Sequence, residues 1–268
     1  MLCFATAPLW AAPWSPVVSI GLLRDDNTTN AIRDQKADDA ATAKISFSSL
    51  RVIDRHWQGN LGVDLTSTHW REYQGLDLTN LSVSAGLRRK FGLGPLAPRV
   101  DFSVEAGRSF ARTEQRTSNF LNAEAAYSQR LNALLSWRAS ATLERLNARR
   151  AVFSTTAHTF KLGGNYDFTP NWRLSGHLRS RFGDLVSWCR ESFPEFLGTT
   201  QWKDGIFGGD WFPYQTVSRT NSAHISLAYS LSDRSTVAIS GDFSRSATRK
   251  SKHVYYNEII SLVFAHAF

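Results

Sequence analysis

Seven histidines are the residues of this chain best suited to acid–base or metal chemistry: His56, His69, His158, His177, His224, His253 and His266. None belongs to a nucleophile elbow, a metal-ligand spacing, a phosphate loop or a dinucleotide fingerprint. Ser67 could pair with His69, and Ser222 with His224, but serine is so common here that such proximity carries little weight. The sequence therefore predicts no catalytic, cofactor-binding or metal-binding residue, and a protein that is not an enzyme.

The elements that carry these residues show a repeat of two. Residues 100–107 and 135–144 alternate between apolar and polar side chains, which a strand separates onto two faces and a helix would mix. No stretch approaches 18 consecutive apolar residues, which excludes a transmembrane helix but not a barrel whose strands are apolar at alternate positions. The segments predicted as strands are 16–24, 41–53, 57–70, 78–91, 99–112, 119–131, 134–147, 155–168, 172–183, 217–231, 235–247 and 253–268.

The connectors between these segments alternate in length. Short turns such as 132–133 and 169–171 alternate with longer and more polar connectors, of which 184–216 is the longest. Transmembrane barrels have short periplasmic turns and long extracellular loops, and an even number of strands leaves both termini on the periplasmic side. The pattern predicts an all-β fold, a transmembrane antiparallel up-and-down β-barrel of about 12 strands.

The last strand carries a further signal. Ile260, Leu262, Phe264, His266 and Phe268 share one face, and this ending resembles the C-terminal signature that the barrel-assembly machinery reads. The chain as a whole resembles the porin-like outer-membrane β-barrels of Gram-negative bacteria. The resemblance implies an outer-membrane location, contact with outer-membrane lipid and lipopolysaccharide, and recognition of Phe268 by the assembly machinery.

The N-terminal residues differ from the rest of the chain. Residues 1–12 are apolar and rich in small side chains, with Ala5-Thr6-Ala7 as a possible cleavage site, so they are interpreted as the remnant of a signal peptide. The alternative is an apolar N-terminal strand. Residues 16–268 are assigned to the barrel. Cys3 then falls in the leader and Cys189 in the predicted loop, which leaves no disulfide within the mature chain.

The two faces of the predicted strands have different roles. Apolar alternates should face lipid, and aromatic residues near segment ends should form girdles at the membrane boundaries (Trp57, Trp70, Tyr127, Tyr166, Trp172 and Tyr229). The polar alternates should line the lumen, where an unpaired charge would be costly. The candidates for lumen or pore residues are Arg138, Lys161, Arg173, His177, Arg179, Arg181, Asp101, Glu105, Glu124 and Glu144.

Two arrangements satisfy these lumen charges. They can stand in water in an open pore, or they can pair across the lumen and close it. Arg173, Arg179 and Arg181 follow one strand with His177 between them, and this ladder either favours anionic solutes or pairs with acidic residues of neighbouring strands.

The connector 184–216 is unusually aromatic. A disordered loop would contain few aromatic residues, so the connector is expected to fold, as a constriction or as a lid, and it could contact glycans. Its candidate residues are Trp188, Trp202, Trp211, Phe212 and Tyr214.

Three functions remain open. The net charge of +8 is spread singly along the chain, which argues against nucleic acid and suits anionic lipid. A porin-like channel for small solutes is the first interpretation, because twelve strands can enclose a modest aqueous lumen. An export barrel working with a periplasmic partner is the second, from a loose similarity to the C-terminal barrels of surface lipoprotein assembly modifiers and polysaccharide exporters. A lipid hydrolase is the third, and a serine–histidine pair on the outer rim facing lipid would favour it.

Overall fold

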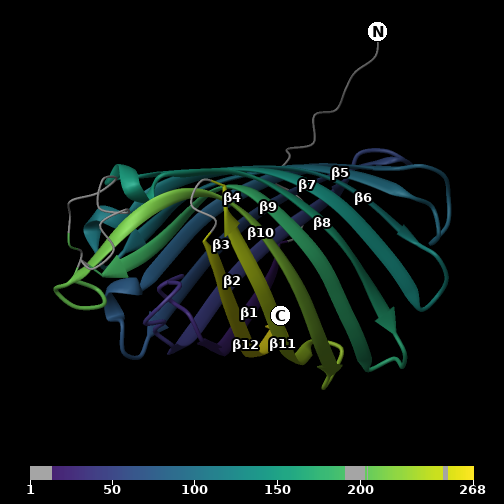
Figure 1. Cartoon of the computed structure of the whole chain (residues 1–268). Helices are drawn as coiled ribbons and strands as arrows, with labels where there is room; N and C mark the ends of the chain where they lie inside the picture. Colours follow the sequence, from purple (N-terminus) through teal and green to yellow (C-terminus); the bar gives the residue numbers. More distant parts are fainter. Residues whose placement is uncertain (1–13, 191–202, 204, 250–252) are drawn as a thin grey trace, which may run out of the picture.

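Twelve antiparallel strands form a closed barrel in the computed structural model, which describes residues 14–190, 203, 205–249 and 253–268 (Figure 1). The predicted fold is confirmed. Residues 1–13, and with them the predicted signal-peptide remnant, lie outside the described residues. The strands are β1 (Ser15–Asp25), β2 (Asp38–Val52), β3 (Trp57–Trp70), β4 (Leu78–Lys90), β5 (Arg99–Ala111), β6 (Ser118–Arg130), β7 (Leu135–Ala148), β8 (Thr155–Asp167), β9 (Trp172–Arg190), β10 (Trp211–Ser230), β11 (Ser235–Thr248) and β12 (Val254–Ala267).

The barrel closes where the first strand meets the last. β1 pairs with β12 from Val17 opposite Ala267 to Asp25 opposite Ile259. Beyond that seam, the Asn27 side chain donates to the Tyr256 carbonyl at 2.8 Å and the Asn257 side chain donates to Asp25 at 2.8 Å. No helix of the described residues has the length and apolar character to span a membrane.

The register decides which side chains face inward. Directly opposed residues of an antiparallel pair point to the same face, so one inward residue on each strand identifies all the others. Arg138 on β7 reaches Asp101 on β5, two strands away, which identifies the concave side. The other face carries exposed apolar side chains, including Leu81, Val83, Phe102, Val104, Leu162, Leu178, Ile225, Ile239, Leu262 and Phe264. Such a surface is what hydrocarbon requires of a membrane barrel.

Aromatic residues gather at the end of the barrel with the short turns. Trp172 lies 4.7 Å from Tyr229, and Phe168 stacks between Tyr166 and Trp172 at ring distances of 6.2 and 6.3 Å. Tyr127 contacts Trp137 at 5.1 Å, and Arg89 lies over the Trp57 ring. These residues form a girdle at the predicted periplasmic boundary. Trp70 does not belong to it, because the register turns Trp70 inward, where it packs against a hydrophobic cluster at the opposite end.

The opposite end carries the longer connectors. Three of them contain short 3-10 helices, η1 (Gln74–Leu76), η2 (Glu114–Arg116) and η3 (Ala151–Phe153). The predicted loop 184–216 is shorter than expected, because β9 continues to Arg190 and β10 starts at Trp211. Cys189 therefore lies in a strand, and it is buried. The sequence pattern missed these residues because they leave the barrel wall and no longer face lipid on one side.

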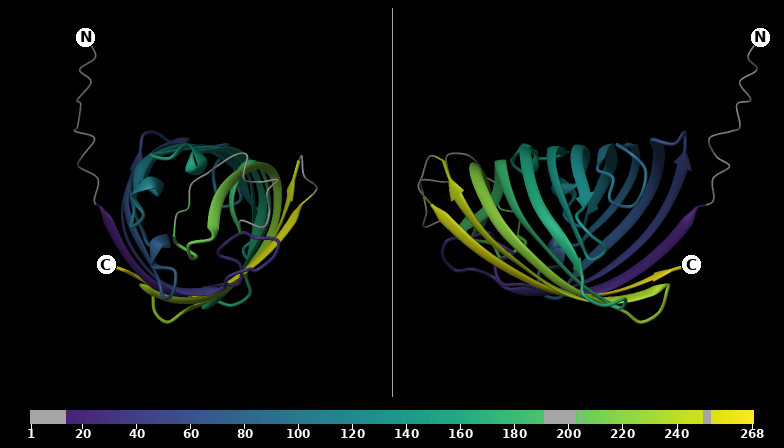
Figure 2. Two further views of the ribbon diagram at one scale, coloured as in Figure 1. Left: turned by 60° about the vertical axis from the view of Figure 1, so that its left-hand side comes forward. Right: turned by 90° about the vertical axis from the view of Figure 1, so that its right-hand side faces the viewer.

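This extension of β9 and β10 is a two-stranded ribbon, formed by residues 184–190 and 211–217. β8 stops pairing with β9 at Gly183, and β11 stops pairing with β10 at Ser218. The light-green start of β10 lies inside the ring of strands in the left view of Figure 2. Gly183 has φ of +149°, and a Cβ there would lie 2.2 Å from the Thr156 carbonyl oxygen and 2.5 Å from the Ala157 Cα. A glycine at this position lets β9 stay against β8 while the ribbon turns inward.

The variant Gly183→Ala tests this role of Gly183. The added methyl group must push β9 away from the β8 backbone, and overpacking of this kind costs about 1–3 kcal/mol. We expect a lower urea midpoint for the refolded variant in detergent and faster proteolysis within the ribbon. Gly209→Ala is the matched control, because a Cβ at Gly209 meets nothing within 4 Å. Equal midpoints for the two variants would contradict the assignment.

Candidate functional site: the lumen and its capped mouth

All ten predicted lumen residues lie on the inner face according to the register. On strands β4 to β7, Asp101 accepts hydrogen bonds from Arg88 at 2.5 Å and from Arg138 at 3.3 Å, and Arg138 also reaches Glu124 at 2.5 Å. Glu105 accepts a hydrogen bond from Asn122 at 3.1 Å. This part of the wall is a chain of alternating charges in which the carboxylates and the guanidinium groups compensate one another.

The same compensation continues on the neighbouring strands. Glu144 accepts from Thr159 at 2.6 Å and from Arg181 at 3.0 Å. Near the short turns, Asp167 pairs with Arg173 at 2.5 Å and lies 3.5 Å from Arg130. Across the barrel, Lys44 pairs with Asp64 at 2.9 Å. Arg173 and Arg181 therefore form ion pairs with acidic residues. Of the three arginines in the predicted basic ladder, Arg179 is left without such an ion pair among the described residues.

Lys90 and Arg99, opposed beside the turn between β4 and β5, have no acidic partner among the described residues, and neither do Lys161 and Arg179. Lys161 and Arg179 lie directly opposite each other on β8 and β9, so their side chains share one face. Among the residues that the structure describes, no carboxylate forms an ion pair with either, and Arg179 donates to the Ser222 hydroxyl at 3.2 Å. Ser140 stands opposite Lys161 on β7, and Ser222 opposite Arg179 on β10. Two cations flanked by two hydroxyl groups form a row of hydrogen-bond donors suited to an anion.

The next row toward the short turns brings together two histidines and an aspartate. His177 stacks on His224 with ring centroids 4.6 Å apart, and His224 Nδ1 lies 2.9 Å from the Asp242 carboxylate. Their nitrogen and oxygen atoms lie within 4.8 Å of one another, a set that imidazole-binding metals such as Zn²⁺ can use. The positive charges of Lys161 and Arg179, one row away, would repel a divalent cation. We therefore interpret the three residues as part of the polar lining of the lumen and not as a metal site. The three residues come from three different strands, so no short spacing motif in the sequence marks this cluster.

Four connectors meet over the mouth of the barrel at the end opposite the short turns. The β1–β2 connector, η1, η3, the ribbon and residues 205–210 before β10 contribute to one buried hydrophobic cluster, which consists of Ala31, Leu76, Val152, Phe153, Trp188, Phe207 and Trp211. Trp211 is 1% exposed, and its ring lies 5.8 Å from that of Phe207. Because β3 and β9 are on opposite sides of a twelve-strand ring, a cluster that joins their ends must span the mouth. We call this cluster, with the ribbon, the cap.

Polar contacts hold the ribbon in place. The Trp188 amide donates to the Thr29 carbonyl at 2.9 Å, and the Gln215 side chain donates to the Ser154 carbonyl. The Tyr214 and Tyr255 hydroxyls are 2.8 Å apart. Of the predicted loop residues, Trp188, Trp211, Phe212 and Tyr214 are buried in or beside the cap, and Trp202 lies outside the described residues. The described part of the connector is thus packed against the barrel mouth.

The two serine–histidine pairs considered from sequence differ in the structure. Ser222 and His224 face the lumen, where His224 bonds to Asp242. Ser67 and His69 face outward on β3, and Ser67 Oγ lies 3.1 Å from His69 Nε2. The predicted absence of catalytic residues therefore stays a prediction for this second pair.

No protein-family model matches the chain, and no curated protein matches it significantly. Its structure is similar to that of an outer membrane channel from Pseudomonas putida F1, with a TM-score of 0.61, 9% identity, and coverage of 96% of this chain and 97% of that one. It is also similar to the KdgM porin in complex with disordered oligogalacturonate, with a TM-score of 0.50, 10% identity, and coverage of 94% and 99%. The predicted outer-membrane location agrees with this fold and with the outward apolar surface. The chain thus has the fold of these outer-membrane channels, a closed transmembrane β-barrel of twelve antiparallel strands.

Proposed function

We propose that this barrel is a passive channel for small solutes with a preference for anions. The observation that carries the proposal is the pair Lys161 and Arg179, which stand side by side on the lumen wall without a carboxylate partner among the described residues. The repulsion between two unit charges about 5 Å apart is roughly 1 kcal/mol in water and larger where water is partly excluded. An anion between them relieves that repulsion, which makes the row attractive to anionic solutes.

The rest of the inner wall supports this preference because its charges largely cancel. Where Arg88, Arg138 and Arg181 face the lumen, carboxylates accept hydrogen bonds from them. A wall of this kind is polar enough to hold water and has little net charge of its own. The KdgM porin was solved with an acidic oligosaccharide, and a solute with carboxylate groups would likewise suit Lys161 and Arg179.

The cap acts in this proposal as the constriction of the extracellular entrance. It spans the mouth and is built from buried aromatic side chains, so it narrows the path by packing rather than by charge. A solute must pass beside or through the cap before it reaches Lys161 and Arg179.

Removing the two cations is expected to change ion selectivity. In a planar bilayer with a salt gradient, the wild-type reversal potential should indicate preferential passage of chloride. The double variant Lys161→Gln, Arg179→Gln should move that potential toward cation preference, since the lumen then carries two fewer positive charges. Arg145→Gln is the control, because Arg145 faces lipid opposite Leu121. An unchanged potential in the double variant, or no conductance in the wild type, would refute the proposal.

Opening the cap is expected to enlarge the conductance. Trp211→Ala removes a side chain that is 1% exposed, and truncation of a buried tryptophan costs about 3–5 kcal/mol of local packing. The strands below the cap keep their pairing, so the refolded variant should insert normally and give larger single-channel steps than the wild type. Trp172→Ala, in the periplasmic girdle, is the comparison. Steps of unchanged size in Trp211→Ala would show that the cap is not the narrowest point.

A further inference from the structure

Ser67, His69 and Asp77 have the order and spacing of a nucleophile, a base and an orienting carboxylate. Ser67 Oγ lies 3.1 Å from His69 Nε2, and His69 Nδ1 lies 3.6 Å from an Asp77 carboxylate oxygen. With its proton on Nδ1 toward Asp77, the His69 ring presents Nε2 to accept the Ser67 proton. This is the relation in which a histidine activates a serine hydroxyl for attack on an ester.

The barrel register builds this arrangement. Ser67 and His69 are two residues apart on β3 and therefore lie on the same, outward face. Asp77 ends η1, one residue before β4, and accepts a hydrogen bond from the Trp70 amide at 2.8 Å. Arg112 lies 3.4 Å from Asp77 Oδ2, the oxygen that also faces His69 Nδ1. The carboxylate is 14% exposed, whereas the histidine ring is 68% exposed, so the base is open to a substrate while its partner is held.

The position of Ser67 on its strand places it at the outer boundary of the membrane. Trp57 marks the periplasmic girdle on the same strand, ten residues earlier. Ten residues of strand span roughly 33 Å. At a tilt of about 40° this corresponds to about 25 Å along the membrane normal, which is the height of the apolar band of such barrels. Ser67 and His69 are therefore level with the ester bonds of outer-leaflet lipids.

A lipid-facing groove lies beside His69. It has a volume of about 580 Å³ and is lined on its apolar side by Leu22, Ala41, Ile260 and Leu262. Arg24 and Arg71 stand at its extracellular rim, where both contact Asp39. An acyl chain fits the apolar part of the groove, and the two guanidinium groups suit the phosphate of a lipid headgroup.

We propose that Ser67, His69 and Asp77 hydrolyse the carboxylic ester of a long-chain, phosphate-bearing lipid of the outer leaflet. Ser67 Oγ attacks the ester carbonyl carbon while His69 takes its proton. His69 then gives that proton to the leaving alcohol oxygen as the ester C–O bond breaks, which leaves an acyl-serine. Water attacks the acyl-serine, His69 accepts the proton of the water and returns it to Ser67, and the fatty acid leaves. The Thr79 hydroxyl, 3.0 Å from Ser67 Oγ, can donate to the carbonyl oxygen during both attacks.

This activity is separate from the proposed channel, because the three residues lie on the outside of the barrel wall. Loss of hydrolysis therefore leaves conductance intact, and loss of conductance leaves hydrolysis intact. The two proposals can fail independently.

The test uses the full chain, refolded in detergent and mixed with phosphatidylethanolamine in one arm and lipid A in the other. Fatty-acid release is measured in both arms, and a fluorophosphonate probe reports covalent reactivity of the serine. We expect release and labelling by the wild type, and a loss of release of at least about 100-fold in Ser67→Ala and in His69→Ala. Asp77→Asn, which still accepts the hydrogen bond from Trp70, should lose about tenfold or more because it favours the wrong histidine tautomer.

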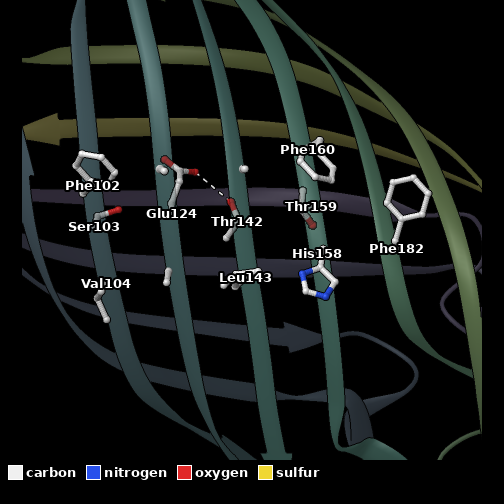
Figure 3. Close-up of a pocket in the computed structure, with 13 residues that line it drawn as sticks. Phe102, Ser103, Val104, Glu124, Thr142, Leu143, His158, Thr159, Phe160 and Phe182 are labelled. Carbon is white, nitrogen blue, oxygen red and sulfur yellow. Dashed lines mark hydrogen bonds between the residues drawn. The ribbon is translucent and has the colours of Figure 1, made fainter.

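His158→Ala is the matched control. His158 also faces lipid on the outer wall, beside a groove of about 750 Å³ with Leu143, Phe160 and Phe182, and it lacks a serine or carboxylate partner among the described residues (Figure 3). Its variant should keep release within about twofold of the wild type, and the heat-dependent gel shift of folded barrels verifies that every variant has refolded. Release from one lipid alone identifies that lipid as the substrate. Release or labelling that survives Ser67→Ala, or a wild type inactive on both lipids, would overturn the proposal.

Discussion

The constraint on which this structure depends is that a backbone inside a membrane must find all its hydrogen-bond partners within the protein. A sheet meets it only by closing on itself, and here the closure is the pairing of β1 with β12. The side chains of Asn27 and Asn257 continue that seam above the last paired residues. Once the ring is closed, the register of every strand follows from its neighbours, and with it the division of side chains between lumen and lipid.

Because of that division, the inner and outer faces of the barrel wall differ in chemical character, although only one layer of strands separates them. Inside, guanidinium and carboxylate groups satisfy one another across neighbouring strands, as around Arg138, and Lys161 with Arg179 interrupts that balance. Outside, the surface is apolar except where strands end, and the polar trio of Ser67, His69 and Asp77 lies at such an end. Alternate residues of one sheet can therefore serve two unrelated purposes.

Where a short turn joins two strands, the sequence predicts which of their residues pair. A three-residue turn at 169–171 places Lys161 opposite Arg179 and Asp167 opposite Arg173, because a tight hairpin determines the pairing of its strands. The turn at 232–234 likewise places His224 opposite Asp242. The strand segments and the polarity of their faces followed from alternation alone.

Where a long connector joins two strands, the sequence does not predict which of their residues pair. The pairing of His177 with His224 spans the connector after β9, whose length leaves the register open, and the ribbon that buries Trp188 and Trp211 leaves the alternating pattern altogether. The short 3-10 helix η1 brings Asp77 close to His69, and the alternation of apolar and polar residues does not predict such a helix. The position of Cys189 within this ribbon gives the native protein its own reporter. Cys189 is 6% exposed, so a thiol-alkylating reagent reaches it when the cap is displaced, and the rate of alkylation in an intact cell envelope then reports how often that displacement occurs.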